Sequence, residues 1–167
     1  NKRYLSNDCL DGMEPVVTGS DVYRYRYQDS GKYVDPNLAL YQQAAPAKLY
    51  RAPEKLIYRF INRQLVFAYD DRQRLTLNSC NVVIPRVERL DMKYIMAVLN
   101  SRVAQYMYEK RYHVVKVLRS HIESIPIPLA DVRSQQEIIQ MADNLMTCEH
   151  RVDLYDEIDD AVRRLYG

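Results

Sequence analysis

The side chains with the clearest chemical potential in this sequence are basic ones that recur beside short apolar stretches. They are Arg24, Arg26, Arg51, Lys55, Arg63, Arg72 and Arg74. An arginine guanidinium presents a planar fork of N–H donors that matches the oxygens of a phosphate or the edge of a guanine. Charge and placement therefore predict that these residues contact a nucleic acid.

The elements that would position most of these residues lie between Lys55 and Pro85. In residues 56–61, one strand face would hold Leu56, Tyr58 and Phe60, and the other Ile57, Arg59 and Ile61. Residues 65–69 repeat the alternation, and residues 75–84 add a third strand. Polar residues between these stretches predict turns. We therefore expect an antiparallel meander whose connections carry Arg63, Arg72 and Arg74.

A shorter alternation runs from Val22 to Tyr27. As a strand, it would place three tyrosines on one face and Arg24 and Arg26 on the other. We expect the tyrosines to line a core. The two arginines, spaced two residues apart, would then both be able to reach a nucleic-acid backbone.

The common catalytic constellations are missing from the sequence. Its four glycines are isolated, which excludes a glycine-rich phosphate loop, and its three histidines show no metal-ligand spacing. Asp70 and Asp71 are not followed by the Glu-x-Lys of a metal-dependent nuclease, so we expect them in a solvated hairpin turn. We assign no catalytic residue, metal or cofactor to this chain.

Composition indicates a globular protein. The chain has 167 residues, of which 47% are apolar, enough to bury a core. It has no apolar run approaching the roughly 20 residues that span a bilayer, and no signal-peptide pattern at its start. Three distant cysteines fit neither a disulfide framework nor a Cys-x-x-Cys metal site, so we expect free, mostly buried thiols. We expect a cytoplasmic protein without a membrane partner.

Charge is divided unevenly along the chain. Residues 1–90 hold 14 Lys/Arg and 10 Asp/Glu, residues 91–128 hold 6 and 3, and residues 129–167 hold 4 and 9. A basic body suggests a polyanionic partner, while the acidic tail would face water or a basic partner. Ordinary solvated faces would give the same pattern.

Helical signals appear in three places. Asp35 and Pro36 predict the start of a short helix over residues 36–44. From Asp91, apolar residues at spacings of three and four predict one helix through Met107 that packs on the sheet. A basic run follows, which we interpret as a return strand or loop, and it contains Lys110, Arg111, His113, Lys116 and Arg119. Residues 124–128 contain two prolines and must be extended.

A long final helix is predicted to begin at a capping box of Ser134 and Glu137. Its apolar stripe shifts phase after Tyr155, which indicates a kink or a new helix at Asp153 or Asp156. The narrow stripe favours an antiparallel or coiled-coil partner, including a second chain in a homodimer. The predicted fold class is therefore α+β, with an antiparallel β-rich domain and packed helix followed by a long C-terminal helical region.

Several segments together resemble a known family. They are GSDVYRY (19–25), PEKLIYRFINRQLVFAYDDRQRLTLNSCNVVIP (53–85), YIMAVLNSRVAQYMYEKR (94–111), LRSHIESIPIP (118–128) and YDEIDDAVRRLYG (155–167). In this order they are similar to the TaqI-like C-terminal specificity domain of type II restriction-modification enzymes, over residues 15–167. Such domains resemble the target-recognition domains of type I specificity subunits.

The resemblance implies a division of labour with a missing domain. An upstream N6-adenine methyltransferase domain would bind S-adenosylmethionine and flip the adenine, while this domain grips double-stranded DNA and reads its bases. The motif matches add Arg59 and Asn78 to the candidate DNA-binding residues. Residues 1–14 would be a linker from the upstream domain, residues 15–128 the target-recognition domain and residues 129–167 a helical segment.

Three functions remain open at this point. The first is a DNA-recognition module, inactive as an enzyme by itself, whose parent chain methylates DNA, with or without an additional endonuclease activity. The second is a protein-interaction or dimerisation module that uses the C-terminal helix, or a fragment like a type I specificity subunit. A free-standing enzyme is the third, and the missing constellations argue against it.

Overall fold

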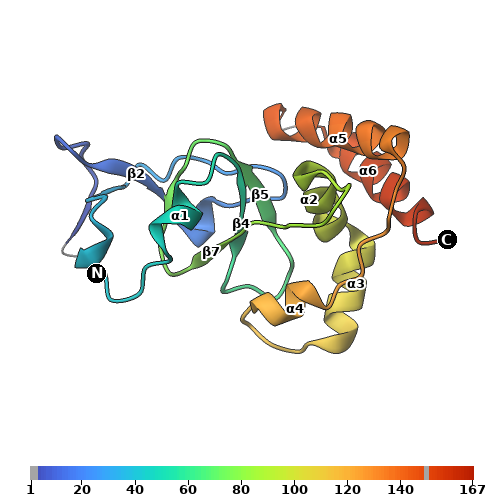
Figure 1. Cartoon of the computed structure of the whole chain (residues 1–167), viewed down its shortest axis with the longest axis horizontal. Coiled ribbons are helices and arrows are strands. Elements are labelled where there is room, and N and C mark those ends of the chain that lie inside the picture. Colours follow the sequence, from blue (N-terminus) through green and yellow to red (C-terminus); the bar gives the residue numbers. More distant parts are fainter. Residues whose placement is uncertain (1–3, 149–150) are drawn as a thin grey trace.

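A three-stranded antiparallel sheet forms the centre of the molecule (Figure 1). The computed structural model describes residues 4–148 and 151–167. The sheet contains β4 (Lys55–Arg59), β5 (Phe67–Asp70) and β7 (Cys80–Val83). Both β5 and β7 pair with β4, so the expected antiparallel pairing is confirmed, but the meander order is wrong. The chain between them leaves the sheet as β6 (Leu75–Thr76) and returns on the far side of β4.

The alternation predicted for β4 is confirmed by burial. Leu56 and Tyr58 belong to the largest hydrophobic cluster, together with the helices, whereas Ile57 belongs to a second cluster on the other face. Both faces of the central sheet therefore pack against apolar clusters.

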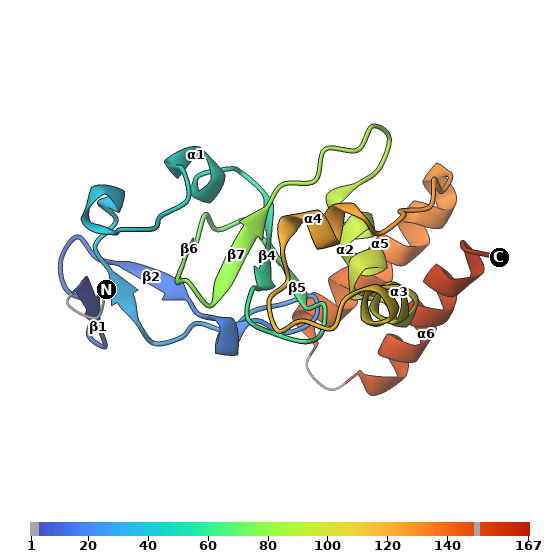
Figure 2. The same ribbon diagram turned by 90° about the horizontal axis from the view of Figure 1, so that it is seen from below.

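A second, four-stranded sheet lies beyond the central one (Figure 2). Its order is β1 (Leu5–Ser6), β3 (Tyr33–Val34), β2 (Glu14–Val17) and β6, and the β2–β6 pairing is parallel. The stretch expected to be a linker, residues 1–14, therefore contributes a paired strand, β1. The helix expected over residues 36–44 is only a 3₁₀ turn at Leu38–Leu40, capped by Asn37 and not by Asp35, followed by α1 (Ala47–Tyr50).

Residues 22–27 form a tight turn, so the predicted strand is wrong. Val22 pairs with Tyr27, and the Tyr23 amide donates to the Arg26 carbonyl. The reversal occurs at Tyr25, whose φ of 75° lies in the left-handed region. Its side chain is nevertheless buried and packs near Tyr155. A reversal in the middle of the segment means that Arg24 and Arg26 do not share one strand face.

The helix that starts at Asp91 is confirmed, together with its cap, because the Asp91 side chain accepts from the Lys93 amide. It does not run to Met107. Instead, α2 (Met92–Asn100) ends at Ser101, and α3 (Arg102–Arg111) begins there. The Ser101 hydroxyl donates to the Val98 carbonyl and accepts from the Ala104 amide. The serine thus caps α3 and satisfies backbone groups at the break.

The helices α4 (Arg119–Glu123), α5 (Val132–Thr147) and α6 (Val152–Arg164) complete the chain. Residues 126–131, which follow α4, have no regular secondary structure, and Ser124, at the start of the stretch expected to be extended, has helical backbone angles instead. Asp131 caps α5, so the predicted Ser134–Glu137 capping box is wrong. The predicted new helix after the phase shift is confirmed as α6, which begins at Val152. The fold class, α+β, is confirmed.

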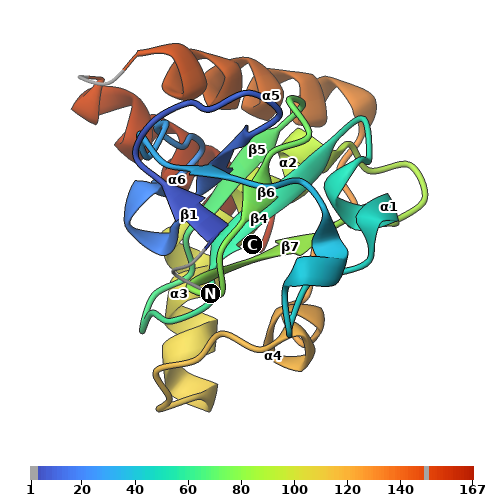
Figure 3. The same ribbon diagram turned by 90° about the vertical axis from the view of Figure 1, so that its left-hand side faces the viewer.

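The apolar stripes of α5 and α6 are covered within the same chain. Ile138, Ala142 and Leu145 of α5, and Ile158 of α6, lie in one cluster with α2 and the sheet. Figure 3, viewed from the side of the outer sheet, shows α5 and α6 together beside the central strands. The division expected at residues 128 and 129 stays a prediction, and the hydrophobic core is shared across it.

Candidate nucleic-acid interface

Several of the predicted DNA-binding residues lie at the two ends of the central sheet. Arg63 is in the turn between β4 and β5, whereas Arg72 and Arg74 follow the other end of β5. Lys55 begins β4 at that second end and is completely buried, with 0% exposure. Its ammonium group donates to Asp70 and to the Tyr50 carbonyl oxygen, 2.9 Å away. This corrects the expectation for Lys55, which supports the interior and cannot contact DNA.

Asp70 is the centre of a buried polar cluster. Its carboxylate accepts from the Tyr27 hydroxyl (2.7 Å), the Arg72 amide (3.1 Å) and the Arg74 amide (3.0 Å), in addition to Lys55. Burial lowers the pKa of Lys55, and the neighbouring Asp70 opposes that effect. Asp70 and Asp71 were both expected in a solvated turn. Asp71 is exposed, but Asp70 is buried and holds the turn together through its hydrogen bonds.

Two arginines near this end are paired with surface carboxylates. Arg74 lies 3.0 Å from Asp29, and Arg51 forms a two-pronged contact with Glu14 at 2.8 and 2.9 Å. Arg72 is exposed, and no carboxylate lies within 4 Å of its guanidinium in the described ranges. These charges are spread around the Asp70 cluster and partly neutralised, which makes this end a weak site for a polyanion.

Arg26 and Arg59 come together on the ring of Tyr23, and we call these three residues the Tyr23 group. Their guanidinium carbons lie 5.0 and 5.6 Å from the ring centroid, and Arg59 Nε donates to the Val22 carbonyl at 2.7 Å. Cation–π contact of this kind helps to fix the position of a guanidinium. The structure therefore brings two of the predicted residues together at the end of β4 that leads to Arg63.

The turn that precedes this group in the chain is hydrogen-bonded to the turn between β6 and β7. The Gly19 amide donates to Ser79 Oγ at 2.8 Å, and Gly19 itself is buried. A Cβ atom at Gly19 would lie 2.7 Å from the Ser79 carbonyl oxygen. Only glycine allows this close approach, so the position of Tyr23 depends on a residue that carries no side chain.

Arg24 does not join this group. It donates to both oxygens of Asp159 on α6, at 3.1 and 3.2 Å, and Asp159 is only 4% exposed. The same carboxylate also accepts from the Arg102 amide. Arg24 therefore ties the 22–27 turn to the C-terminal helix, which corrects the expectation that it faces a nucleic acid.

Another basic surface combines Arg63 with residues 110–119, a basic run that the sequence interpretation did not assign to DNA binding. Between α3 and α4 the chain returns to the β4–β5 turn, where Ile61 pairs with Lys116 and the Val117 amide donates to the Phe60 carbonyl at 2.8 Å. Figure 1 shows this loop and the turn at the lower edge of the molecule. We call the following exposed residues the basic rim: Arg63, Lys110, Arg111, Lys116 and Arg119.

The rim keeps most of its charge available. In the described part of the chain, no carboxylate lies within 4 Å of the charged groups of Arg63, Lys110 or Lys116. Arg111 donates to the Ser124 carbonyl at 3.1 Å, and Arg119 pairs with Glu123 at 2.6 Å. The sequence shows most of the rim as one basic run. The position of this run beside Arg63, however, depends on a contact between segments that are distant in the sequence.

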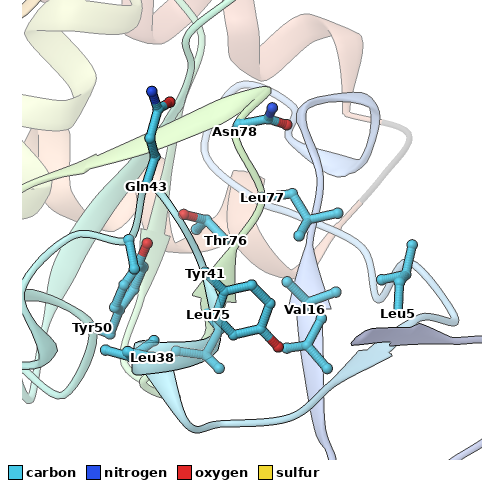
Figure 4. A pocket seen from close by; sticks show the side chains of 12 residues that line it. Leu5, Val16, Leu38, Tyr41, Gln43, Tyr50, Leu75, Thr76, Leu77 and Asn78 are labelled. Carbon is cyan, nitrogen blue, oxygen red and sulfur yellow. The ribbon is translucent and has the colours of Figure 1, made fainter. Parts of the chain in front are cut away.

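Asn78 lies apart from the rim, at the edge of a pocket in the outer sheet (Figure 4). The pocket has a volume of about 380 Å³ and is lined mainly by apolar side chains, among them Val16, Tyr41 and Leu75. No lysine or arginine is among its lining residues in the described chain. It therefore lacks the charge that would bind a phosphate.

Within residues 4–148 and 151–167, no three His, Cys, Asp or Glu side chains come together as a metal site. Among the helices of these same ranges, none has both the length and the apolar character needed to cross a bilayer. Burial raises the pKa of the Cys80 thiol to about 12, which keeps it protonated and unreactive at neutral pH.

Comparison with known proteins identifies the family of this chain. A family model described as the TaqI-like C-terminal specificity domain matches residues 14–127. This stretch includes the central sheet, every strand of the outer sheet except β1, the Tyr23 group and the whole basic rim. A search of curated proteins gave no match. A specificity domain is not catalytic, and its role is DNA target recognition in restriction-modification. The chain belongs to the family of TaqI-like C-terminal specificity domains.

Proposed function

We propose that this chain grips double-stranded DNA with the basic rim and so holds the target sequence in place. The observation that carries the proposal is the pairing of Ile61 with Lys116, which joins two basic segments that are far apart in sequence. Cations gathered on a rigid edge neutralise adjacent phosphates and release counterions, the main source of affinity for a duplex.

The Tyr23 group extends this surface. Arg59 is two residues from Ile61, and both Arg59 and Arg26 are held over the Tyr23 ring. A guanidinium held in this way has already lost much of its side-chain freedom, so it suits the bidentate contact with a guanine that specificity requires. In the proposed complex, the rim contacts phosphates and the Tyr23 group contacts base edges.

The catalytic partner in this proposal is a methyltransferase domain of the same protein, which would bind S-adenosylmethionine and act on an adenine in the cytoplasm. The competing function, dimerisation through the C-terminal helix, gains no support from α5, because Ile138, Ala142 and Leu145 are buried against the chain's own core. The recognition role therefore accounts better for the exposed surfaces.

Fluorescence anisotropy with a labelled 30-base-pair duplex of mixed sequence tests the proposal. We expect the double variant R63A/K116A to bind at least ten-fold more weakly at low salt, because each exposed cation that contacts a phosphate is lost. R72A is the matched control, since Arg72 is equally exposed but lies at the other end of β5. Equal affinity for R63A/K116A and the unmodified chain would refute the proposal.

A further inference from the structure

Four apolar side chains protrude among the cations of the basic rim. They are Ile61 (58% exposed), Val114 (44%), Val115 (53%) and Leu118 (42%). Scattered apolar residues are common on protein surfaces, but a contiguous group surrounded by one sign of charge marks a binding surface. These side chains therefore need an explanation that the phosphate contacts of the rim do not give.

The segment that carries Val114 and Val115 is fixed at both ends. On one side, the Tyr112 ring stacks on His121 with centroids 3.9 Å apart, and its hydroxyl donates to Ser124 Oγ at 3.0 Å. On the other side, Val117 is fully buried and bonded to Phe60. The two exposed valines thus lie at the tip of an anchored loop, where they pay little conformational entropy on binding.

The charge around the tip identifies the occupant. Lys110, Arg111 and Lys116 flank the valines in sequence, and Arg63 belongs to the turn that Lys116 pairs with. Such a surface attracts a polyanion, and the only apolar group that duplex DNA exposes in its major groove is the 5-methyl group of thymine. An apolar tip inside a cationic frame matches that combination of phosphates and methyl groups.

We propose that Val114 and Val115 contact thymine methyl groups in the major groove and make this loop a determinant of sequence preference. This inference rests on the proposed function, because the rim must first bind the duplex. It assigns different tasks to neighbouring residues. The cations supply affinity for any sequence, while the two valines favour a pyrimidine that carries a methyl group at C5.

The test removes methyl groups from the DNA and from the protein separately. The 167-residue chain is used to select its preferred duplex from a random library, and each thymine of that duplex is then replaced by deoxyuridine. We expect at least one replacement to weaken binding about four-fold, the effect of one lost methyl contact. In V114A/V115A, the same replacement should have almost no effect. V132A, which shortens a valine on α5 that is 70% exposed, should retain the preference for thymine.

The outcomes separate the inference from the proposed function. If V114A/V115A discriminates thymine from deoxyuridine as well as the unmodified chain does, or if no thymine is sensitive, the inference is wrong. R63A/K116A should bind both duplexes more weakly but keep their ratio. If that variant binds as tightly as the unmodified chain, the proposed function fails as well, and the inference falls with it. Circular dichroism checks that the exposed substitutions leave the fold intact.

Discussion

At the scale of single residues, the Lys55–Asp70 pair shows how a charged side chain that was predicted to lie on the surface can be buried in an ion pair. Lys55 opens β4 and faces inward, and Asp70 ends β5 directly opposite it in the register of the sheet. A buried pair is tolerated when further hydrogen bonds satisfy both groups. Asp70 meets this condition through Tyr27 and two backbone amides, so the pair orders the turn that presents Arg72.

Removing one member of this pair should be severely destabilising. D70A leaves the Lys55 ammonium buried without its counter-charge, and we expect a loss of about 3–5 kcal/mol in the free energy of unfolding. D71A removes an exposed neighbour in the same turn and should change stability by less than about 0.5 kcal/mol. Urea denaturation followed by circular dichroism measures both. Similar small losses in the two variants would show that Asp70 is not the centre of the turn.

Thiol reactivity gives a second prediction at the residue scale. Cys9 and Cys148 are exposed, whereas Cys80 is buried and its pKa is raised to about 12 by burial. Since the thiolate is the reactive form, a disulfide reagent at pH 8 should label two thiols quickly and the third only after denaturation. Fast labelling of all three thiols in the folded protein would contradict the burial of Cys80.

The limits of sequence reasoning are clear at this scale. Alternation predicted that Arg24 and Arg26 share a face, but a left-handed residue, Tyr25, reverses the chain between them. Tyrosine gives no warning of positive φ, because glycine and asparagine are the residues that usually adopt it. Of the seven arginines predicted as DNA contacts, Arg26 and Arg59 share the Tyr23 ring, and Arg63 lies on the rim.

At the scale of elements, the periodicity of the sequence predicted β4, β5, α2 and the separation of α5 from α6. It did not reveal which elements would be neighbours. The β6 segment pairs with β2, which is about 60 residues earlier in the chain. Local sequence patterns do not predict this partner, because the pairing depends on tertiary contacts. The sequence did not predict the break between α2 and α3 at Ser101, because the apolar stripe continues across it at the spacing of a single helix.

The C-terminal helices allow a prediction about assembly. Ile138 is 2% exposed and packs inside the chain, so I138A should lower the free energy of unfolding by about 2–5 kcal/mol without changing the molar mass in light scattering. V132A on the exposed side of the same helix is the control and should be nearly neutral. A dimer that I138A dissociates while the monomer stays equally stable would restore the interaction-module hypothesis.

At the scale of the whole molecule, the acidic C-terminal segment acts partly as an internal counter-charge. Asp143 pairs with Lys93, Asp156 with Arg102, and Asp159 with Arg24. The sequence suggested that this tail faces water or a basic partner. Instead, these carboxylates neutralise cations that pack beside α6 and α5, so the net positive charge of the body is left mainly to surfaces such as the basic rim.

Buried tyrosines give the molecule a characteristic response to alkaline pH. Burial raises the pKa of Tyr94 and of Tyr166 to about 12. In the unfolded chain these groups lose their protons near pH 10. Above that value the folded state binds more protons, and the free energy of unfolding falls as pH rises from about 10 to 12.

Absorbance at 295 nm and urea denaturation across this range should therefore show that part of the tyrosine ionises only as the protein unfolds. Y166F should weaken the pH dependence, although it also removes the hydrogen bond from the Tyr166 hydroxyl to the Pro126 carbonyl. Complete ionisation of all tyrosines near pH 10, with the fold intact, would contradict the burial of these hydroxyls.

The salt dependence of DNA binding tests the central claim most directly. The logarithm of the affinity should fall linearly with the logarithm of the salt concentration, and each phosphate contact should contribute about −0.9 to the slope. We expect R63A/K116A to reduce the magnitude of the slope by about two, while R72A leaves it unchanged. An unaltered slope in R63A/K116A, or an equal reduction in R72A, would show that the basic rim is not the surface that grips the duplex.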